Sequence, residues 1–425
     1  MTTRRIEVAI VGGGIAGLAL AAGLIKQQHL NVHVYESVGR YSDVGAGLAL
    51  HLNAMKAMDC LGPEVRQAYA EKALTMGEEH QEMATQVILA HGPFSGQVVA
   101  ELGSAKGRKT VSRADLLDGF RALIPPSRLY FRKRLREIQE LPASEGHRLQ
   151  LKFEDGTSAS ADCLLAADGI HSITRAYMLG ADHPATAPKN HDGWQIYRTM
   201  VSTEEAREQI NPRWTTNVPI FIGPTGHVNC IPLNKNTRLS AGVAVRGRTF
   251  ENRGKPNSLD PDLYMDYSED AQQIIKMVAK DTSSSWAAAD HDHAPFYAQN
   301  NVAIFGDAAH AALPFAGNGA AQALEDAAVL NALFGCIKEP KEIAAALRAF
   351  CEIRRPRSQA IVDLSRKFGR IYAFSENGMH EDPARLKTFF GLTAAMTNYF
   401  DVKRQNDDAI KLFNRFLKDG ANGQA

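Results

Sequence analysis

The hydrophobic pattern of the chain begins with an apolar segment, "VAIVGGGIAGLALAAGLI", which covers residues 8–25 without a charged side chain. A membrane-spanning helix needs about 20 predominantly apolar residues in one helical state. Glycines interrupt this segment near its start, so two shorter elements fit the pattern better. It predicts a buried, β-branched strand over 8–11, a tight glycine turn, and a buried Ala/Leu-rich helix over 15–25.

The glycine turn has the spacing Gly12-x-Gly14-x-x-Gly17 and lies between a strand and a helix. In this context small residues let the backbone approach a pyrophosphate, whose charge lies at the helix N-terminus. The next alternating strand, "NVHVYES", ends at Glu36, whose carboxylate can accept hydrogen bonds from ribose hydroxyls. The combination predicts a dinucleotide site, and a glycine-rich packing turn is the alternative.

Further periodic segments follow. We expect a second glycine turn at Gly45 and a helix that ends at Gly62. An amphipathic helix is predicted over 111–124, with Ser112 as its N-cap. Residues 148–169 predict a hairpin around an Asp-Gly turn, and its second strand becomes apolar as if it entered a buried sheet.

The later chain predicts a change of architecture. Alternating strands between turn-rich segments occupy residues 190–246 and predict an antiparallel sheet. From Asn301 the pattern returns to a buried strand, a glycine turn and a long helix. Since 425 residues exceed what one hydrophobic core usually supports, two or more domains are expected. The expected units are a nucleotide-binding domain over 1–180 and 298–365, an inserted sheet domain over 181–297, and a C-terminal helical region over 366–425.

Composition narrows the function. Lys and Arg number 48 against 47 Asp and Glu, so the charge favours neither nucleic acid nor an anionic membrane as a partner. The five cysteines form no C-x-x-C pair, which is typical of a reducing, cytoplasmic setting and argues against a cysteine-based zinc site. The "DHDH" at 290–293 is not expected to bind a metal, because adjacent loop residues rarely converge on one ion.

Three glycine-bearing motifs stand in a fixed order: the first turn, "ADGIHSITR" at 167–175 and "GDAAHAALP" at 306–314. With "VGAGLAL" and the "SRADLL" helix, this set resembles the single-component flavoprotein aromatic hydroxylases, which include the para-hydroxybenzoate and salicylate hydroxylases. The salicylate hydroxylase-like members are the most similar. The resemblance implies an α/β fold, with a Rossmann-like FAD-binding domain, an inserted antiparallel-sheet substrate domain and C-terminal helices.

The same resemblance implies FAD as the cofactor. The residues it places at FAD are Gly12, Gly14 and Gly17 at the pyrophosphate, Glu36 at the adenosine ribose, Arg113, Asp307 at the ribityl chain, and Gly319 at the start of a helix that faces the flavin. Asp168, with Gly169, Ser172 and Arg175, is linked in the family to both FAD and NAD(P)H. Surface ion pairs are the alternative for Arg113 and Arg175, and a helix cap is the alternative for Asp307.

No second complete G-x-G-x-x-G is present, so a nicotinamide donor is expected to bind only transiently. The resemblance implies that NADH or NADPH reduces the flavin, which reacts with dioxygen to give a flavin hydroperoxide that attacks an electron-rich ring. The protein then orients the ring and excludes water. Pro314 resembles the family proline beside the flavin, and a simple turn before a helix is its alternative.

Strand alternation suggests a substrate pocket. In "WQIYRTMV" it places Trp194 and Arg198 on one face, where the guanidinium suits a carboxylate or phenolate, or a structural ion pair. In "HVNCIPL" it places His227 and Asn229 together. His227 is a candidate general base because imidazole titrates near neutral pH, although a histidine after a turn is often only solvated. Phe315 provides an aromatic wall on which a ring could stack.

We therefore expect an enzyme that hydroxylates a small phenolic substrate, with salicylate converted to catechol by loss of carbon dioxide as the favoured reaction. The alternatives are hydroxylation or oxidative dearomatisation of a larger phenol, a reductase or halogenase on the same scaffold, and a flavin-binding protein without turnover. Neither a nucleic-acid nor a membrane partner is expected, and the chain is expected to be a monomer or a homodimer.

Overall fold

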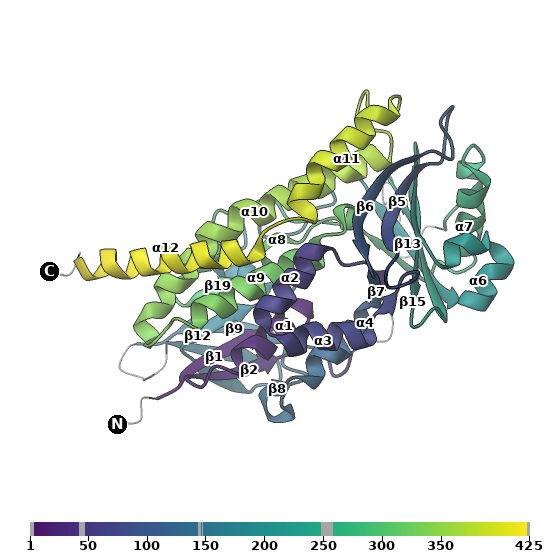
Figure 1. The fold of residues 1–425 in the computed structure, drawn as a ribbon. Helices are drawn as coiled ribbons and strands as arrows, with labels where there is room; N and C mark the ends of the chain where they lie inside the picture. Colours follow the sequence, from purple (N-terminus) through teal and green to yellow (C-terminus); the bar gives the residue numbers. More distant parts are fainter. Residues whose placement is uncertain (1–3, 42–46, 143–145, 147, 248–257, 423–425) are drawn as a thin grey trace.

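A six-stranded sheet, parallel except for the edge pairing of β18 with β19, forms the base of the molecule (Figure 1). The computed structural model describes residues 4–41, 47–142, 146, 148–247 and 258–422. The sheet has the order β18-β19-β12-β1-β2-β8, in which β1 runs parallel to both β2 and β12. Its strands are β1 (Ile6–Val11), β2 (Leu30–Tyr35), β8 (Leu129–Tyr130), β12 (Cys163–Ala166), β18 (Ala298–Gln299) and β19 (Val302–Ile304). The central position of β1 explains its apolar sequence, because both of its faces are covered.

The elements around this sheet confirm several sequence predictions. The glycine turn leads from β1 into α1 (Ile15–Leu24), and α2 (Leu52–Leu61) ends before Gly62. Ser112 caps α4 (Arg113–Ala122), because its Oγ accepts a hydrogen bond from the Asp115 N–H. The hairpin is present as β10 (Leu149–Phe153) and β11 (Ser158–Ala161), and the chain then enters the buried β12. The expected turn at Gly45 lies outside the described residues.

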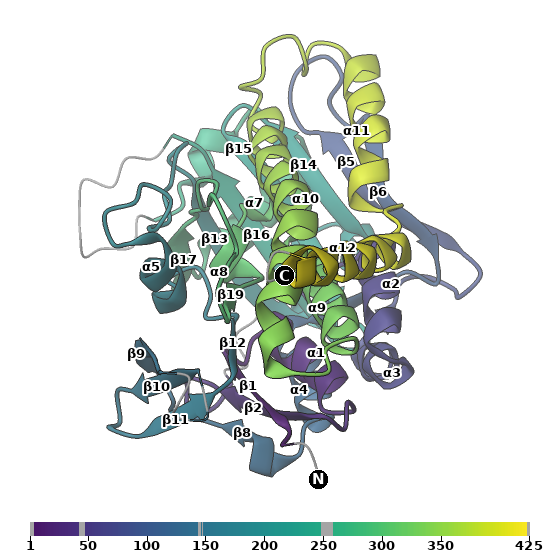
Figure 2. The same ribbon diagram turned by 90° about the vertical axis from the view of Figure 1, so that its left-hand side faces the viewer.

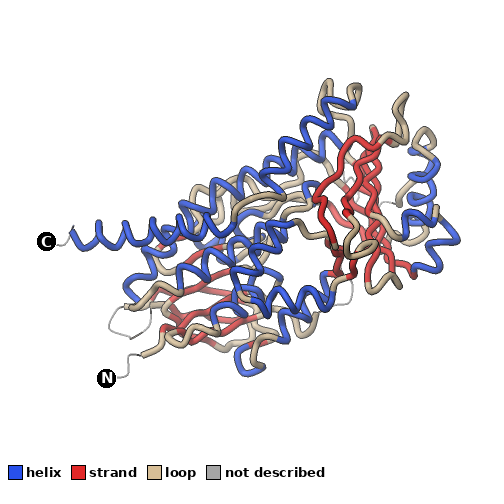
Figure 3. The backbone as a smooth tube through the Cα atoms, in the orientation of Figure 1, coloured by secondary structure: helices blue, strands red, loops and turns tan. Residues whose placement is uncertain are grey.

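A seven-stranded sheet stands beside the base, visible as the second group of strands in Figure 3. Its order is β17-β13-β16-β15-β14-β5-β6. The strands are β5 (Glu82–Leu89), β6 (Val98–Lys106), β13 (Gln195–Ser202), β14 (Val218–Gly223), β15 (Gly226–Leu233), β16 (Arg238–Val245) and β17 (Ser284–Ala287). Two of them, β5 and β6, come from the stretch that the sequence analysis assigned to the nucleotide-binding domain. The pairing of β5 with β14 is parallel, so the sheet is mixed rather than purely antiparallel.

Helices cover both faces of this sheet. On the outer face lie α6 (Thr203–Gln209) and α7 (Glu269–Ala279), and on the other side lie α10 (Ile343–Tyr372) and α11 (Pro383–Thr397) (Figure 1). Figure 2 shows α10 and α11 in front of the strands. A domain boundary at 365 would cut α10, which runs continuously from one unit to the other. The final helix, α12 (Val402–Asn422), packs along α9 (Gly319–Phe334) and α10. No helix in the described part of the chain combines the length and the apolar character that crossing a membrane requires.

Candidate active site

A cavity of about 600 Å³ lies between the two sheets. On one side it is bounded by the turns after β1, β2 and β12, which lie at the carboxyl ends of parallel strands, where α/β sheets bind their ligands. On the other side it is bounded by the inner face of the seven-stranded sheet. Most of the site residues expected from the sequence line this cavity, and those outside its wall are Gly17, Ser172, Arg175, Trp194 and His227.

The three glycines of the first turn are required for different structural reasons. Gly12 has a φ of +103°, and a Cβ there would lie 2.1 Å from the Ala167 carbonyl oxygen. A Cβ at Gly17 would lie 1.9 Å from the Gly12 carbonyl oxygen. A Cβ at Gly14 would meet nothing within 4 Å, because this residue faces the cavity. Packing therefore explains Gly12 and Gly17, whereas Gly14 leaves room for a ligand at the uncapped N-terminus of α1.

Glu36 supports this turn from the end of β2. Its Oε2 accepts a hydrogen bond from the Gly13 N–H at 2.6 Å, and its Oε1 accepts one from the Val38 N–H at 2.8 Å. The side chain is buried yet borders the cavity. Because a carboxylate oxygen can accept more than one hydrogen bond, Glu36 can hold the turn and still accept a ribose hydroxyl.

Asp307 and Arg113 approach the cavity from the starts of two helices. Asp307 is the first residue of α8 (Asp307–His310), whose N-cap is Gly306, and no side-chain capping bond is present. The helix-cap alternative therefore does not describe Asp307. Asp307 is exposed to the cavity, and desolvation by the surrounding walls raises its pKa, while the charges of His310 and Arg113 act in the opposite direction. Arg113 is exposed to the cavity and forms no ion pair with any residue that the structure describes.

The middle motif organises the wall beside Asp307. Asp168 borders the cavity and accepts hydrogen bonds from the Ser172 hydroxyl at 2.5 Å and the Thr174 N–H at 3.0 Å, at the start of α5 (Ile173–Leu179). Arg175 is fully buried and does not reach the cavity. It donates to backbone carbonyl oxygens, including that of Ala309 at 2.6 Å. Arg175 therefore does not form a surface ion pair. Its hydrogen bonds connect α5 to α8.

The sequence analysis did not foresee a buried charged network under the start of α9. Asp326 accepts hydrogen bonds from the Gly306 N–H at 2.8 Å and from Arg354 Nε at 2.6 Å, and it pairs with His310 Nε2 at 2.6 Å. Burial alone would raise the pKa of Asp326, but His310 and Arg354 outweigh it and hold the pKa at about 2. The network fixes the turn before Asp307, and Gly319 opens α9 onto the cavity with free space around it. Its sequence signal is a pair of adjacent acids in an apolar helix, "ALEDAA".

The inner face of the seven-stranded sheet is arranged in rows across the strands. Paired residues in neighbouring strands point to the same face, so the registers define three rows. The cavity rows are Arg198, Gly242, Asn229, Ile220 and Val87, and then Met200, Ser240, Ile231, Val218, Thr85 and Leu102. The third row, closer to α10, contains Ile196, Ala244, His227, Ile222 and Leu89.

Arg198 is the cation of the first cavity row. Its side chain is half-buried, and its guanidinium carbon lies 4.8 Å from the centre of the Trp286 ring. Burial lowers the pKa of Arg198. Within the described ranges it forms no ion pair and no side-chain hydrogen bond, so the structural ion pair that the sequence allowed is not seen there. Pro314 and Phe315, at the start of the short helix η5 (Pro314–Ala316), also line the cavity.

His227 lies one row deeper than Arg198, and Trp194, directly before β13, lies beyond that row, which corrects their expected position at the ligand. Trp194 is fully buried with its ring 4.4 Å from that of Phe315. The His227 ring lies 5.0 Å from Phe315 and 5.1 Å from Tyr372. Burial lowers the pKa of His227 to about 3, so the imidazole is neutral near pH 7. A general base requires a pKa near the working pH and contact with the substrate, and this arrangement supplies neither.

The fold and the site together define a class of enzyme. In this class a dinucleotide-binding cleft at the carboxyl ends of parallel strands opens into a ligand cavity bounded by a second sheet. A family model described as an FAD binding domain matches residues 5–365. The chain is 36% identical over 419 residues to 6-methylsalicylate 1-monooxygenase of Aspergillus terreus, covering 97% of this chain and 93% of that one. It is 32% identical to a salicylate hydroxylase of Pseudomonas putida, covering 86% and 85% of the two chains.

A solved salicylate hydroxylase substrate complex has the same fold, with a TM-score of 0.80 and 27% identity over 96% of this chain and 98% of that chain. The protein belongs to the FAD-binding-domain family and is a single-component, FAD-dependent aromatic monooxygenase of the salicylate hydroxylase type. The residues fit the cofactor: Gly14 leaves an open cradle at the N-terminus of α1, and the Asp307 carboxylate faces the same cavity.

Proposed function

We propose that this enzyme converts salicylate, or a ring-alkylated salicylate, to the corresponding catechol. NADH or NADPH and dioxygen are the co-substrates. One oxygen atom enters the ring at the carbon that bears the carboxylate, carbon dioxide leaves, and the second oxygen atom leaves as water. The similarity to a salicylate hydroxylase and a 6-methylsalicylate 1-monooxygenase supports this substrate class.

The cofactor half of the cavity supports the redox part of the proposal. Bound FAD would carry electrons from the nicotinamide donor to dioxygen. Backbone N–H groups at Gly14 and the first turn of α1 would bind its pyrophosphate, and Glu36 would accept a ribose hydroxyl. Asp307 and Arg113 would contact the chain between the nucleotide and the flavin ring. The uncapped start of α9 at Gly319 would present its partial positive charge to that ring.

The substrate half of the cavity supports an anionic aromatic compound as the substrate. Its central observation is Arg198, a half-buried guanidinium on the cavity floor without a carboxylate partner among the described residues. A guanidinium binds a carboxylate through two parallel hydrogen bonds. Asn229 lies two strands from Arg198 in the same row, across Gly242, and offers further hydrogen bonds, while Ile220 and Ile231 would exclude water from the ring. Phe315 borders the space in which the ring would stack.

The test is turnover by the holoenzyme with salicylate labelled with ¹³C in its carboxyl group. We expect salicylate to stimulate NAD(P)H oxidation and oxygen uptake, and to yield catechol and ¹³CO₂ in equal amounts. A dihydroxybenzoate that retains the label would show ring hydroxylation without decarboxylation. Absence of any stimulation by salicylate or its alkyl derivatives would refute the proposed substrate class.

A further inference from the structure

The ring of Phe315 lies between the cavity and a group of buried aromatic side chains. It is only 4% exposed and lines the cavity. On its other sides the Trp194 ring centre lies 4.4 Å away, and the His227 ring lies at 5.0 Å in an edge-on arrangement. Neither of these two residues reaches the cavity wall. Phe315 is therefore the aromatic side chain of this group that a ligand in the chamber would contact.

Gly369, in the last turn of α10, leaves the space in which the Phe315 ring lies. Its φ is not positive, so its backbone conformation does not require glycine, and a helix is more stable with alanine than with glycine. A Cβ built on Gly369 would lie 2.5 Å from Phe315 Cδ2, 2.7 Å from Phe315 Cε2 and 3.0 Å from Trp194 Cζ2. Room for the Phe315 ring is therefore the structural reason for a glycine at this position.

Ser365 holds α10 at a fixed separation from the segment that carries Phe315. It is buried four residues before Gly369, so the two residues lie on the same face of the helix. The Ser365 hydroxyl donates a hydrogen bond to the Leu313 carbonyl oxygen and accepts one from the Ala316 N–H at 3.1 Å. Both partners flank Phe315 in the chain. If α10 moved away to make room for a side chain at position 369, these hydrogen bonds would break.

The cavity is the direction in which the Phe315 ring can move. Ordinary contacts of a Cβ begin at 3.4 Å, so a Cβ at Gly369 would have to displace the nearest ring atom from 2.5 Å by about 0.9 Å. Trp194 cannot yield in the same way, because it is fully buried. Its N–H donates to Asn190 Oδ1 at 2.8 Å, and its carbonyl oxygen accepts from the Ala288 N–H at 2.9 Å. A side chain at position 369 would therefore narrow the chamber.

We propose that Gly369 determines substrate specificity by letting Phe315 lie back against α10, which leaves room in the chamber for a substituent on the aromatic ring. The cavity residues on either side of Phe315 near η5 are apolar, as in Leu313 and Ala316, so the substituent is an alkyl group. The substrate class is then a ring-alkylated salicylate. This inference rests on the proposed function, since it needs a salicylate in the chamber. Gly369 acts through Phe315 and is a positioning residue.

The experiment measures dissociation constants on the holoenzyme, by flavin absorbance, for salicylate and its four monomethyl derivatives. We expect the wild type to bind at least one methyl derivative as tightly as salicylate or more tightly. Gly369→Ala should weaken that derivative roughly 10-fold, the loss typical of overpacking a well-packed site, and leave salicylate within about threefold. Gly391→Ala is the matched control. Gly391 is also a helical glycine, in α11, but a Cβ there would meet no described atom within 4 Å, so both dissociation constants should stay unchanged.

Phe315→Val tests whether the effect of Gly369 passes through the ring, because it removes both ring atoms that the new Cβ would meet. In the Phe315→Val background, Gly369→Ala should cause no further loss for the methyl derivative. If Gly369→Ala alone does not fold, the double variant should fold and bind FAD, since the clash with the ring is absent from it. A double variant that also failed to fold would assign Gly369 to folding alone and overturn the inference.

Three results on folded variants would also overturn it. They are equal losses for salicylate and the methyl derivative in Gly369→Ala, the same selective loss in the Phe315→Val background, and a wild type that binds every methyl derivative more weakly than salicylate. Salicylate binding by the wild type would leave the proposed function intact in each case. Failure of all five ligands to perturb the wild-type flavin would instead refute the proposed function.

Discussion

Replacing Arg198 by alanine should weaken the binding of an anionic aromatic ligand and leave FAD in place. A hydrogen bond to a charged group contributes about 1.5–3 kcal/mol. That range converts to roughly a 10- to 150-fold rise in Kd. Because Arg198 is only half-buried, solvent screening favours the lower end, about 10-fold. Arg198→Lys keeps the charge but loses the planar, two-pronged donor geometry, so its loss should be intermediate.

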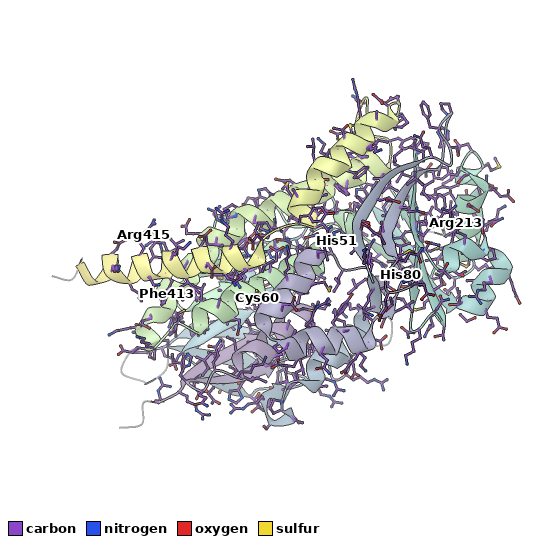
Figure 4. The ribbon with its side chains drawn as sticks, in the orientation of Figure 1. His51, Cys60, His80, Arg213, Phe413 and Arg415 are labelled. Atoms are coloured by element: carbon purple, nitrogen blue, oxygen red, sulfur yellow. The ribbon has the colours of Figure 1, made fainter. Side chains whose placement is uncertain are left out.

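The assay is titration of the holoenzyme with salicylate and with phenol, its analogue without the carboxylate, followed by flavin fluorescence. Phenol should bind the wild type and Arg198→Ala about equally. NAD(P)H oxidation without substrate should persist, because the residue lies far from the glycine turn. Arg213→Ala is the matched control: Arg213 also stacks on a tryptophan, with its guanidinium carbon 4.5 Å from the Trp214 ring centre, but it is outside the cavity wall (Figure 4). Equal losses for salicylate and phenol would refute the anchoring role and assign Arg198 to the stability of the sheet.

Three further predictions follow from burial and charge. Gly14→Val should abolish FAD binding without changing the melting temperature of the apoprotein, since a Cβ there meets no protein atom, and a variant that retained stoichiometric FAD would contradict this. His227→Gln should leave the pH dependence of kcat/KM unchanged between about pH 6 and 8, because burial holds the His227 pKa at about 3. If the variant lost an ionisation in that range, His227 would titrate there in the wild type. Asp326→Asn should cost about 3–5 kcal/mol of unfolding free energy at pH 7, measured by denaturant titration. The folded-state pKa of Asp326 is about 2 against a usual 3.8, so this stabilisation is present above pH 3.8 and is lost as the pH falls towards 2; a difference that stayed constant in acid would argue against it.

Local signals explain which parts of the fold could be predicted. The glycine turn, the Ser112 cap and the hairpin depend on neighbouring residues, and these predictions are confirmed by the structure. The strands β5 and β6 lie in the segment 1–180 that the sequence analysis assigned to the nucleotide-binding domain, yet they pair into the seven-stranded sheet. Their pattern cannot say which sheet they join, because their partner β14 lies more than a hundred residues further along the chain.

The site shows the same limit. Alternation correctly grouped Arg198 with Trp194, and Asn229 with His227, on the inner face of the sheet. It could not show that His227 is covered, because the covering rings of Phe315 and Tyr372 come from distant segments. The sequence likewise assigned the same role at the pyrophosphate to all three glycines. Only the packing around each Cβ position shows that Gly14 borders open space, whereas Gly12 and Gly17 are packed against the backbone.

The parallel pairing of β5 with β14 has a consequence for how the chain matures. The sheet that forms the ligand chamber cannot close until β17, ending at Ala287, has been synthesised, and the parallel sheet also waits for β19 at Val302–Ile304. Each half of the molecule thus depends on residues from both early and late parts of the chain, and pairings between distant segments form slowly. We expect ribosome-bound chains that stop before residue 300 to remain protease-sensitive throughout, and protection to arise in both halves together once α9 and α10 are complete.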